Sequence, residues 1–237
     1  MLRKKAFCLL MTVSAFFGLM ACHAQRSAES AAHEQQDSSA SLGTSIHLKR
    51  ISEFNEPWAL AVLPDGRLLI TERSGQLILF NPIDQTKTLI RNIPKVAYGG
   101  QGGLGDIVLH PDFAQNHQIY LSYAEAGQGG YGAVVIRADL NLDQAQPQLD
   151  NLKMIWKQAP KVRGQGHYAH RMLFDGAGKL WISSGERQKF DPAQDLTSNL
   201  GKMIRLNDDG SVALDNPFQT QGDIAKQIWS LGHRNPL

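Results

Sequence analysis

The 237-residue sequence predicts an all-β fold of the propeller type, and two observations carry that prediction. The first is a recurring phrase of apolar residues, a Pro-Asp or Asp-Gly turn, and an alternating apolar and polar run. Proline fixes φ in such turns, while aspartate and glycine supply a side-chain hydrogen bond and a positive φ. The second is the spacing of the copies, which is typical of four-stranded blades carrying insertions. The copies are Trp58–Gly66 leading into Arg67–Thr71, Leu104–Leu109 with the turn His110–Phe113 leading into Gln118–Tyr123, and Arg171–Phe174 with the turn Asp175-Gly176 leading into Lys179–Ser183.

Further strands are expected after each copy. They are Gly75–Phe80 after the first, Ala133–Ala138 after the second, and Gly201–Leu206 with Ser211–Ala213 after the third. Gln227–Leu231 is expected to begin a fourth blade, so the chain is predicted to hold about three and a half blades. A β-sandwich also suits short strands joined by Gly-rich turns, but it does not require one phrase to recur at blade length. Because an unclosed propeller exposes strand edges, we expect further blades beyond Leu237.

The N-terminal residues predict export. Arg3, Lys4 and Lys5 precede an apolar run over 6–20 that has the length of a signal-peptide core. The run ends in Leu19-Met20-Ala21-Cys22, which resembles a bacterial lipobox and predicts lipidation of Cys22. Cleavage after Ala24 is the alternative, and it would give a freely periplasmic product. We therefore expect a signal peptide over 1–22, a flexible polar linker over 23–45, a partial propeller domain over 46–237, and a periplasmic location with a lipid anchor in the outer membrane.

Composition limits the partners and the means of stabilisation. The two cysteines, Cys8 and Cys22, both lie in the leader, so the domain is expected to have no disulfide. The formal net charge is only +2, and the sequence offers no basic stripe of the kind that nucleic-acid binding needs. Residues 23–45 are rich in Ser, Ala, Gln and Glu, a composition that cannot repay the entropy of ordering.

Four polar residues beside strand-like segments are the candidate site. Gln101, His167, Arg234 and Asn235 together offer a base, a cation and two amides, which suits oxidation of an alcohol against a bound cofactor. Each has a simpler interpretation as well. His167 could be a surface loop histidine, Arg234 the surface arginine of a capped strand end, and the glycines around Gln101 a loop without function. A phosphate cradle is disfavoured there because the Lys-Ser/Thr of a P-loop is missing.

A series of motifs carries a family resemblance. They are Pro57-Trp58-Ala59, Gly100-Gln-Gly-Gly-Leu104 with His110-Pro-Asp-Phe113, Gly166-His-Tyr168 with Arg171, Ala193-Gln-Asp-Leu196, Leu200-Gly-Lys-Met-Ile-Arg205, Asp215-Asn-Pro-Phe218, and Ile228-Trp-Ser230 with Gly232-His-Arg-Asn-Pro236. In order and spacing they resemble the soluble aldose sugar dehydrogenases that depend on pyrroloquinoline quinone (PQQ), the glucose/sorbosone dehydrogenase family. The likeness runs from about Ile51 to the end of the chain.

The resemblance implies a fold, an activity and roles for the candidate residues. The fold is a six-bladed β-propeller that binds PQQ, calcium and an aldose sugar at one mouth of its channel. His167 would be the general base, Arg234 and Asn235 would contact PQQ, and Gln101 would face both PQQ and the sugar. The implied reaction oxidises the sugar at C1 to a lactone, with hydride transfer to PQQ and Arg234 stabilising the reduced quinone.

The chain also departs from the family. In the glucose-oxidising branch an acidic residue precedes the catalytic histidine, but Gly166 stands there in this chain, which looks closer to the broad-specificity aldose branch. The family's calcium ligands and further PQQ-binding basic residues follow Pro236, so the metal site is expected beyond Leu237. A half-propeller would neither close nor complete this site.

Two other functions stay open from the sequence. One is a calcium-dependent propeller lactonase, and the other is a non-catalytic propeller that binds glycans or a protein partner. Several further residues are interpreted as structural. We expect His170 to be structural because it leads into a strand, and Trp58 and His110 to be core and turn residues. Asp65, Asp112 and Asp175 are interpreted as turn formers.

Overall fold

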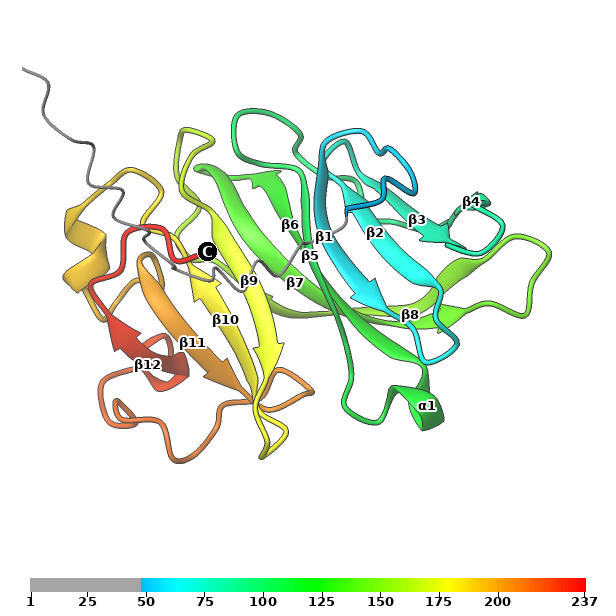
Figure 1. Cartoon of the computed structure of the whole chain (residues 1–237). Coiled ribbons are helices and arrows are strands. Elements are labelled where there is room, and N and C mark those ends of the chain that lie inside the picture. The colour runs from blue at the N-terminus through cyan, green and yellow to red at the C-terminus, as the bar shows by residue number, and fades with distance from the viewer. Residues whose placement is uncertain (1–47) are drawn as a thin grey trace, which may run out of the picture. The chain divides into compact units, whose positions relative to one another are not determined.

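The computed structural model describes residues 48–237, which form three four-stranded antiparallel sheets (Figure 1). In each sheet, strands that are consecutive in sequence are neighbours, as expected for propeller blades. The first sheet contains β1 (Pro57–Val62), β2 (Leu68–Glu72), β3 (Gln76–Phe80) and β4 (Lys87–Leu89). The second contains β5 (Leu104–Leu109), β6 (Gln118–Gly127), β7 (Gly130–Asn141) and β8 (Gln148–Lys157). The third contains β9 (Ala169–Phe174), β10 (Leu180–Ser184), β11 (Lys202–Leu206) and β12 (Ile228–Leu231). The predicted all-β propeller class is confirmed.

Three short helical turns complete the elements of residues 48–237. They are α1 (Phe113–Asn116), η1 (Asp191–Gln194) and η2 (Ala225–Gln227). No helix within residues 48–237 is long and apolar enough to cross a membrane. The predicted signal peptide, Cys22 and the linker lie outside the described residues.

Local turn chemistry makes the hairpins. Between β1 and β2, Leu63 and Arg67 close the turn by a backbone hydrogen bond of 2.8 Å, and a carboxylate oxygen of Asp65 accepts the N–H of Arg67 at 2.9 Å. Gly66 has φ +87°, which favours glycine. Asp175 acts in the same way before β10, where it accepts the N–H groups of Ala177 and Lys179. The turn-forming roles predicted for Asp65 and Asp175 are confirmed.

The middle sheet is buried on both faces. Successive residues of β7 point to opposite sides, so alternate residues enter two hydrophobic clusters. The first cluster joins the first and second sheets and includes Leu69, Leu77, Leu104, Ile119, Leu121, Val134, Ile136 and Leu140. The second joins the second and third sheets and includes Tyr120, Ala133, Val135, Trp156, Leu180, Ile182, Ile204 and Ile228. Burial between sheets therefore holds the three blades together.

The expected half of a fourth blade is wrong. Ile228–Leu231 pairs with β11 and is the outer strand of the third sheet. The segment predicted to fill that place, Ser211–Ala213, makes one isolated bridge, between Leu206 and Val212. It belongs instead to a turn in which the backbone N–H of Asn207 donates to the carbonyl of Ser211 and the side-chain amide of Asn207 donates to the Ser211 hydroxyl. The described residues therefore form three complete blades.

The topology brings several loops to one end of the sheets. In an antiparallel meander, the first strand begins at the end where the second and fourth strands finish. The segments before β5 and β9 thus lie at the same end of their sheets as those after β10 and β12. The first strands also contact one another, β1 with β5 and β5 with β9. Loops from all three sheets can therefore meet beside these strands.

Candidate functional site

His167 and Glu186 face each other because of the register between β9 and β10. Ser184 pairs with Ala169 at the end of this hairpin, so continuing the register places Glu186 opposite His167. The His167 Nδ1 atom makes a short hydrogen bond to Oε1 of Glu186. Both side chains are shielded from solvent, with 13% of His167 and 2% of Glu186 exposed. An ionised carboxylate only accepts hydrogen bonds, so Nδ1 carries the proton and Nε2 keeps its lone pair.

Glu186 is held as a charged acceptor by its own loop. Its Oε2 atom accepts the backbone N–H groups of Lys189 at 2.5 Å and Phe190 at 2.7 Å. Burial works to raise the pKa of Glu186, but the hydrogen bonds from the Phe190 N–H and from His167 outweigh it and hold that pKa below the ordinary value. The pair is thus arranged as a base and the group that orients it.

Gln101 binds the histidine loop at two points. Its side-chain oxygen accepts the backbone N–H of His167 at 2.6 Å, and its own backbone N–H donates to the carbonyl of Gln165 at 2.7 Å. The side chain is exposed, so its amide nitrogen remains available as a donor. The segment before β5 and the segment before β9 are therefore joined at the predicted site.

Asn235 and Arg234 join the same group of loops from the third sheet. The side-chain oxygen of Asn235 accepts the N–H of Ala169 at 3.0 Å, and the carbonyl of Arg234 accepts the N–H of Glu186 at 2.8 Å. The guanidinium of Arg234 is exposed and makes no hydrogen bond to any residue of 48–237. The structure thus brings together the segments that carry all four predicted residues.

Backbone strain is concentrated around the pair. Eleven non-glycine residues between 48 and 237 have a positive φ, and six of them lie in 167–170 or 187–190. Such conformations cost free energy and persist only where surrounding contacts enforce them, which is common at functional sites. The six are His167, Ala169, His170, Arg187, Gln188 and Phe190.

A cavity of about 280 Å³ lies next to these loops. Gln101 and Asn235 line it together with Trp58 and Arg73, whereas His167 and Arg234 are not among its lining residues. A larger cavity of about 630 Å³, lined by the β1–β2 turn and α1, contains none of the predicted site residues. We place the site at the smaller cavity because two of its lining residues hold the loop of the base: Gln101 accepts the N–H of His167, and Asn235 accepts the N–H of Ala169.

His170 is structural, as predicted. It is 2% exposed, its Nδ1 atom lies 2.7 Å from the hydroxyl of Ser122, and its ring stacks on Trp58 with a centroid separation of 5.0 Å. Burial, followed by the charges of Arg171 and Arg187, lowers the pKa of His170 to about 3. It is therefore a neutral packing group between sheets, and not a second base.

His110 and Trp58 differ from each other. His110 is a turn residue, since its Nδ1 atom accepts the N–H of Asp112 at 3.0 Å, and Asp112 begins α1. Trp58 packs against the first hydrophobic cluster but also lines the site cavity. The metal site was expected beyond Leu237, and residues 48–237 contain no group of three or more His, Cys, Asp or Glu that could hold a metal ion.

Comparison with known proteins identifies the family. The family model described as Glucose / Sorbosone dehydrogenase matches residues 54–237. The chain belongs to the glucose/sorbosone dehydrogenase family. The predicted resemblance is confirmed, and the chain spans about half the length of the curated relatives that it matches.

Relatives within this family have related names. Aldose sugar dehydrogenase YliI of Escherichia coli K12 is 38% identical over 185 residues, which cover 78% of this chain and 50% of that protein. Quinoprotein glucose dehydrogenase B of Acinetobacter calcoaceticus is 27% identical over 212 residues, covering 78% of this chain and 44% of that protein.

Solved structures agree with this membership. The apo form of the soluble aldose sugar dehydrogenase from E. coli superposes with a TM-score of 0.73 at 40% identity, covering 76% of this chain and 53% of that one. The PQQ-bound aldose sugar dehydrogenase from Streptomyces coelicolor gives a TM-score of 0.69 at 29% identity, covering 79% of this chain and 54% of that one.

Glu186 was missed by the sequence analysis of this glucose/sorbosone dehydrogenase family member. The sequence places an acidic residue two positions after an apolar strand, a signal that many surface turns share. Only the register of the β9–β10 hairpin places it opposite His167. A search for acids opposite candidate bases across each predicted hairpin would have found it.

Proposed function

We propose that the protein oxidises aldose sugars at C1 to lactones and requires PQQ and calcium. The observation that carries this proposal is the His167–Glu186 pair, which leaves the Nε2 lone pair of a shielded histidine ready to accept a proton. The family membership and the names of its relatives support a sugar as the substrate. The S. coelicolor structure, which is PQQ-bound, supports the cofactor.

The residues of this site match the chemistry of PQQ, an anionic quinone. The exposed guanidinium of Arg234 offers positive charge and hydrogen-bond donors for the quinone oxygens, while Gln101 and Asn235 offer amides. PQQ supplies the two-electron acceptor for the hydride that leaves C1, and calcium supplies further positive charge.

His167 performs the proton transfer in this proposal. Its Nε2 atom takes the proton of the C1 hydroxyl, and the electron pair left on oxygen forms the lactone carbonyl as the hydride leaves carbon. The Glu186 carboxylate stabilises the imidazolium that results. Gln101 fixes the backbone of the base, and Arg234 places a permanent charge where negative charge develops.

The test is a titration of the purified protein, extended by any coding sequence that follows Leu237, with PQQ and calcium while aldose-dependent dye reduction is followed. We expect turnover and a lactone product, and we expect His167→Ala to abolish turnover while PQQ still binds. Retained turnover in His167→Ala would remove the base assignment. Metal-dependent lactone hydrolysis without PQQ would favour the lactonase, and binding of glycans without turnover would favour a non-catalytic propeller.

We also propose that the protein is exported and lipidated at Cys22. The basic residues, the apolar run and the Leu-Met-Ala-Cys sequence support this proposal. Mass spectrometry of the membrane fraction should find a lipid-modified N-terminal peptide beginning at Cys22. A soluble periplasmic protein cleaved near Ala24 would contradict the lipid anchor but not export.

A further inference from the structure

Three cations next to the site bind backbone carbonyls of the loops that carry it. A guanidinium or ammonium group in a protein interior is usually paired with a carboxylate, because burying an unpaired charge is costly. Two of these cations are almost completely buried, with Arg187 1% and Lys202 0% exposed, and neither forms a salt bridge within residues 48–237. The third is Arg73, whose side chain is 24% exposed and also pairs with Glu56 at 3.2 Å.

Arg73 holds the loop of Gln101. It follows β2 in the first sheet, and its Nη2 atom donates to the carbonyls of Gly100 and, at 3.3 Å, Gly102. These two residues are the immediate neighbours of Gln101. The backbone carbonyl of Arg73 also accepts the N–H of Leu104 at 3.0 Å. Arg73 therefore holds this segment with both its guanidinium and its backbone carbonyl.

Arg187 holds the loop of His167. Its Nε atom donates to the carbonyl of Gly166 at 2.8 Å and its Nη2 atom to the carbonyl of Gly164 at 2.5 Å. The remaining Nη1 atom donates to the carbonyl of Tyr131 in the second sheet at 2.7 Å. One planar guanidinium thus connects the base-bearing loop to the neighbouring blade.

Lys202 holds the loop of Arg234 and Asn235 indirectly. Its ammonium group donates to the carbonyls of Pro192, Ala193 and Leu200 at 2.7, 3.0 and 2.6 Å. The Ala193 carbonyl also accepts the N–H of Gly232 at 2.8 Å, so the cation supports the turn on which the Gly232–Asn235 segment rests.

We propose that Arg73, Arg187 and Lys202 are positioning residues, each of which fixes one site-bearing loop through its backbone carbonyls. The anchoring follows from contacts within the chain, whereas its consequence for sugar oxidation rests on the proposed function. For Arg187 and Lys202, a buried cation without a carboxylate is a costly way to stabilise a fold, and apolar residues often do so better. Directional hydrogen bonds to carbonyls instead define where a loop lies.

Amide hydrogen exchange tests the anchoring without any cofactor. The N–H of Gln101 is a suitable probe because it donates to the Gln165 carbonyl, between the two carbonyls that Arg187 binds. Arg→Lys substitution keeps the charge but ends the side chain one bond short of the Nη2 position, which binds both carbonyls in Arg73 and one of the two in Arg187. We expect Arg73→Lys and Arg187→Lys to speed exchange of the Gln101 N–H by about tenfold or more, with the β6–β7 ladder unchanged.

Lys202→Met should act on a different probe. We expect it to speed exchange of the Gly232 N–H by about tenfold and to leave the Gln101 N–H unchanged. Lys226→Met is the matched control, because Lys226 leads into the same segment but its ammonium pairs with Asp223 at the surface. That control should change neither probe.

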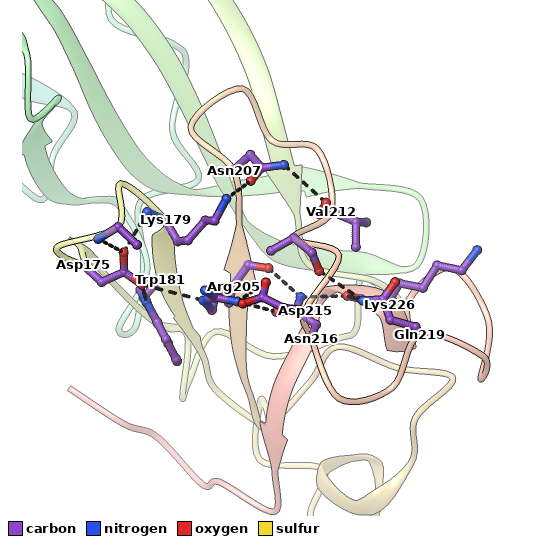
Figure 2. Close-up of polar contacts among 12 residues, drawn as sticks. Asp175, Lys179, Trp181, Arg205, Asn207, Val212, Asp215, Asn216, Gln219 and Lys226 are labelled. Atoms are coloured by element: carbon purple, nitrogen blue, oxygen red, sulfur yellow. Dashed lines mark hydrogen bonds and ion pairs between the residues drawn. The ribbon is translucent and has the colours of Figure 1, made fainter.

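Arg205→Lys is the control for the arginines. Figure 2 shows Arg205 in a polar network with Asp175, Asp215 and Asn216. None of these partners belongs to the loops that carry the site residues. Arg205 is 6% exposed and lies 2.7 Å from Asp215, so its partners are carboxylates and an amide. We expect Arg205→Lys to lower stability without changing exchange at Gln101 or Gly232.

Each outcome decides the proposal. Unchanged Gln101 exchange in Arg73→Lys would overturn it, and this variant should fold because the side chain is partly exposed. Equal acceleration in Arg205→Lys and Arg187→Lys would also overturn it, since it would show general loosening. If wild-type protein oxidises no aldose under any loading, the proposed function fails while the exchange result still decides the anchoring. If turnover is present, Arg73→Lys should lower it although its charge is retained.

Discussion

The carboxylate of Glu186 receives hydrogen bonds from His167, Lys189 and Phe190, and this set determines which imidazole nitrogen is protonated. In Glu186→Gln the amide oxygen can satisfy the two backbone N–H groups only if the NH₂ group faces His167. Nδ1 would then accept, Nε2 would carry the proton, and the base would be blocked. We expect turnover to fall by about 100-fold or more.

Nitrogen NMR of the His167 ring checks this reasoning independently of turnover. The proton should move from Nδ1 in the wild type to Nε2 in Glu186→Gln. Glu125→Gln is the control, because Glu125 pairs with Lys161 and does not contact His167. An unchanged tautomer with full turnover would show that Glu186 does not orient the base.

The burial of His170 predicts how the stability of the protein depends on pH. The pKa of His170 in the folded protein is about 3, below the ordinary value of 6.5. Between pH 6.5 and 3, His170 therefore binds a proton in the unfolded chain but not in the folded one. The contribution of His170 to stability is therefore complete above pH 6.5 and is lost as pH falls toward 3. The slope should approach about 1.4 kcal/mol per pH unit. Ring chemical shifts should remain those of neutral imidazole at pH 4.5, and titration near 6.5 would contradict the assignment.

Among the elements, β5 and β9 meet where His170 fills the space left by a glycine. A Cβ atom on Gly105 would lie 1.8 Å from Cε1 and 2.2 Å from Nδ1 of His170. Gly105→Ala should therefore displace the ring and lower the free energy of unfolding by about 2 kcal/mol or more. Gly176→Ala is the control, since a Cβ there meets no atom within 4 Å, and it should change stability by less than about 0.5 kcal/mol. Chemical denaturation of both variants gives the comparison.

The same elements show what the sequence could predict. Hairpins with local turn chemistry were located closely, and β5 was predicted with its observed bounds. The outer strands β4 and β8 were missed because many of their residues are exposed and do not alternate. The place of β12 depends on pairing with β11 across the residues 207–227, which no local pattern reveals. The same division holds for the candidate site. Local motifs predicted Gln101, His167, Arg234 and Asn235, whereas the place of Glu186 depends on the register between two strands.

At the scale of the whole described chain, β7 couples the two hydrophobic clusters. Ile136 enters the first cluster and Val135 the second, and they are adjacent on one strand. Losing packing on either side should therefore weaken both, so unfolding of residues 48–237 is expected to be one cooperative transition. We expect Ile136→Ala to lower the free energy of unfolding by about 3 kcal/mol and Val135→Ala by about 2 kcal/mol.

Hydrogen exchange measures that coupling. In Ile136→Ala, amide protons of β3 in the first sheet and β11 in the third that exchange through global unfolding should exchange faster by the same factor. We expect this although the Ile136 side chain belongs only to the first cluster. Leu60→Ala is the control, because Leu60 is 53% exposed and its truncation should change stability by less than about 0.5 kcal/mol. Acceleration of β3 alone would mean that the sheets open separately. In that case the loops joined by Gln101, His167 and Asn235 could part without global unfolding, and the site would owe its geometry to its carbonyl-bound cations more than to the cores beneath it.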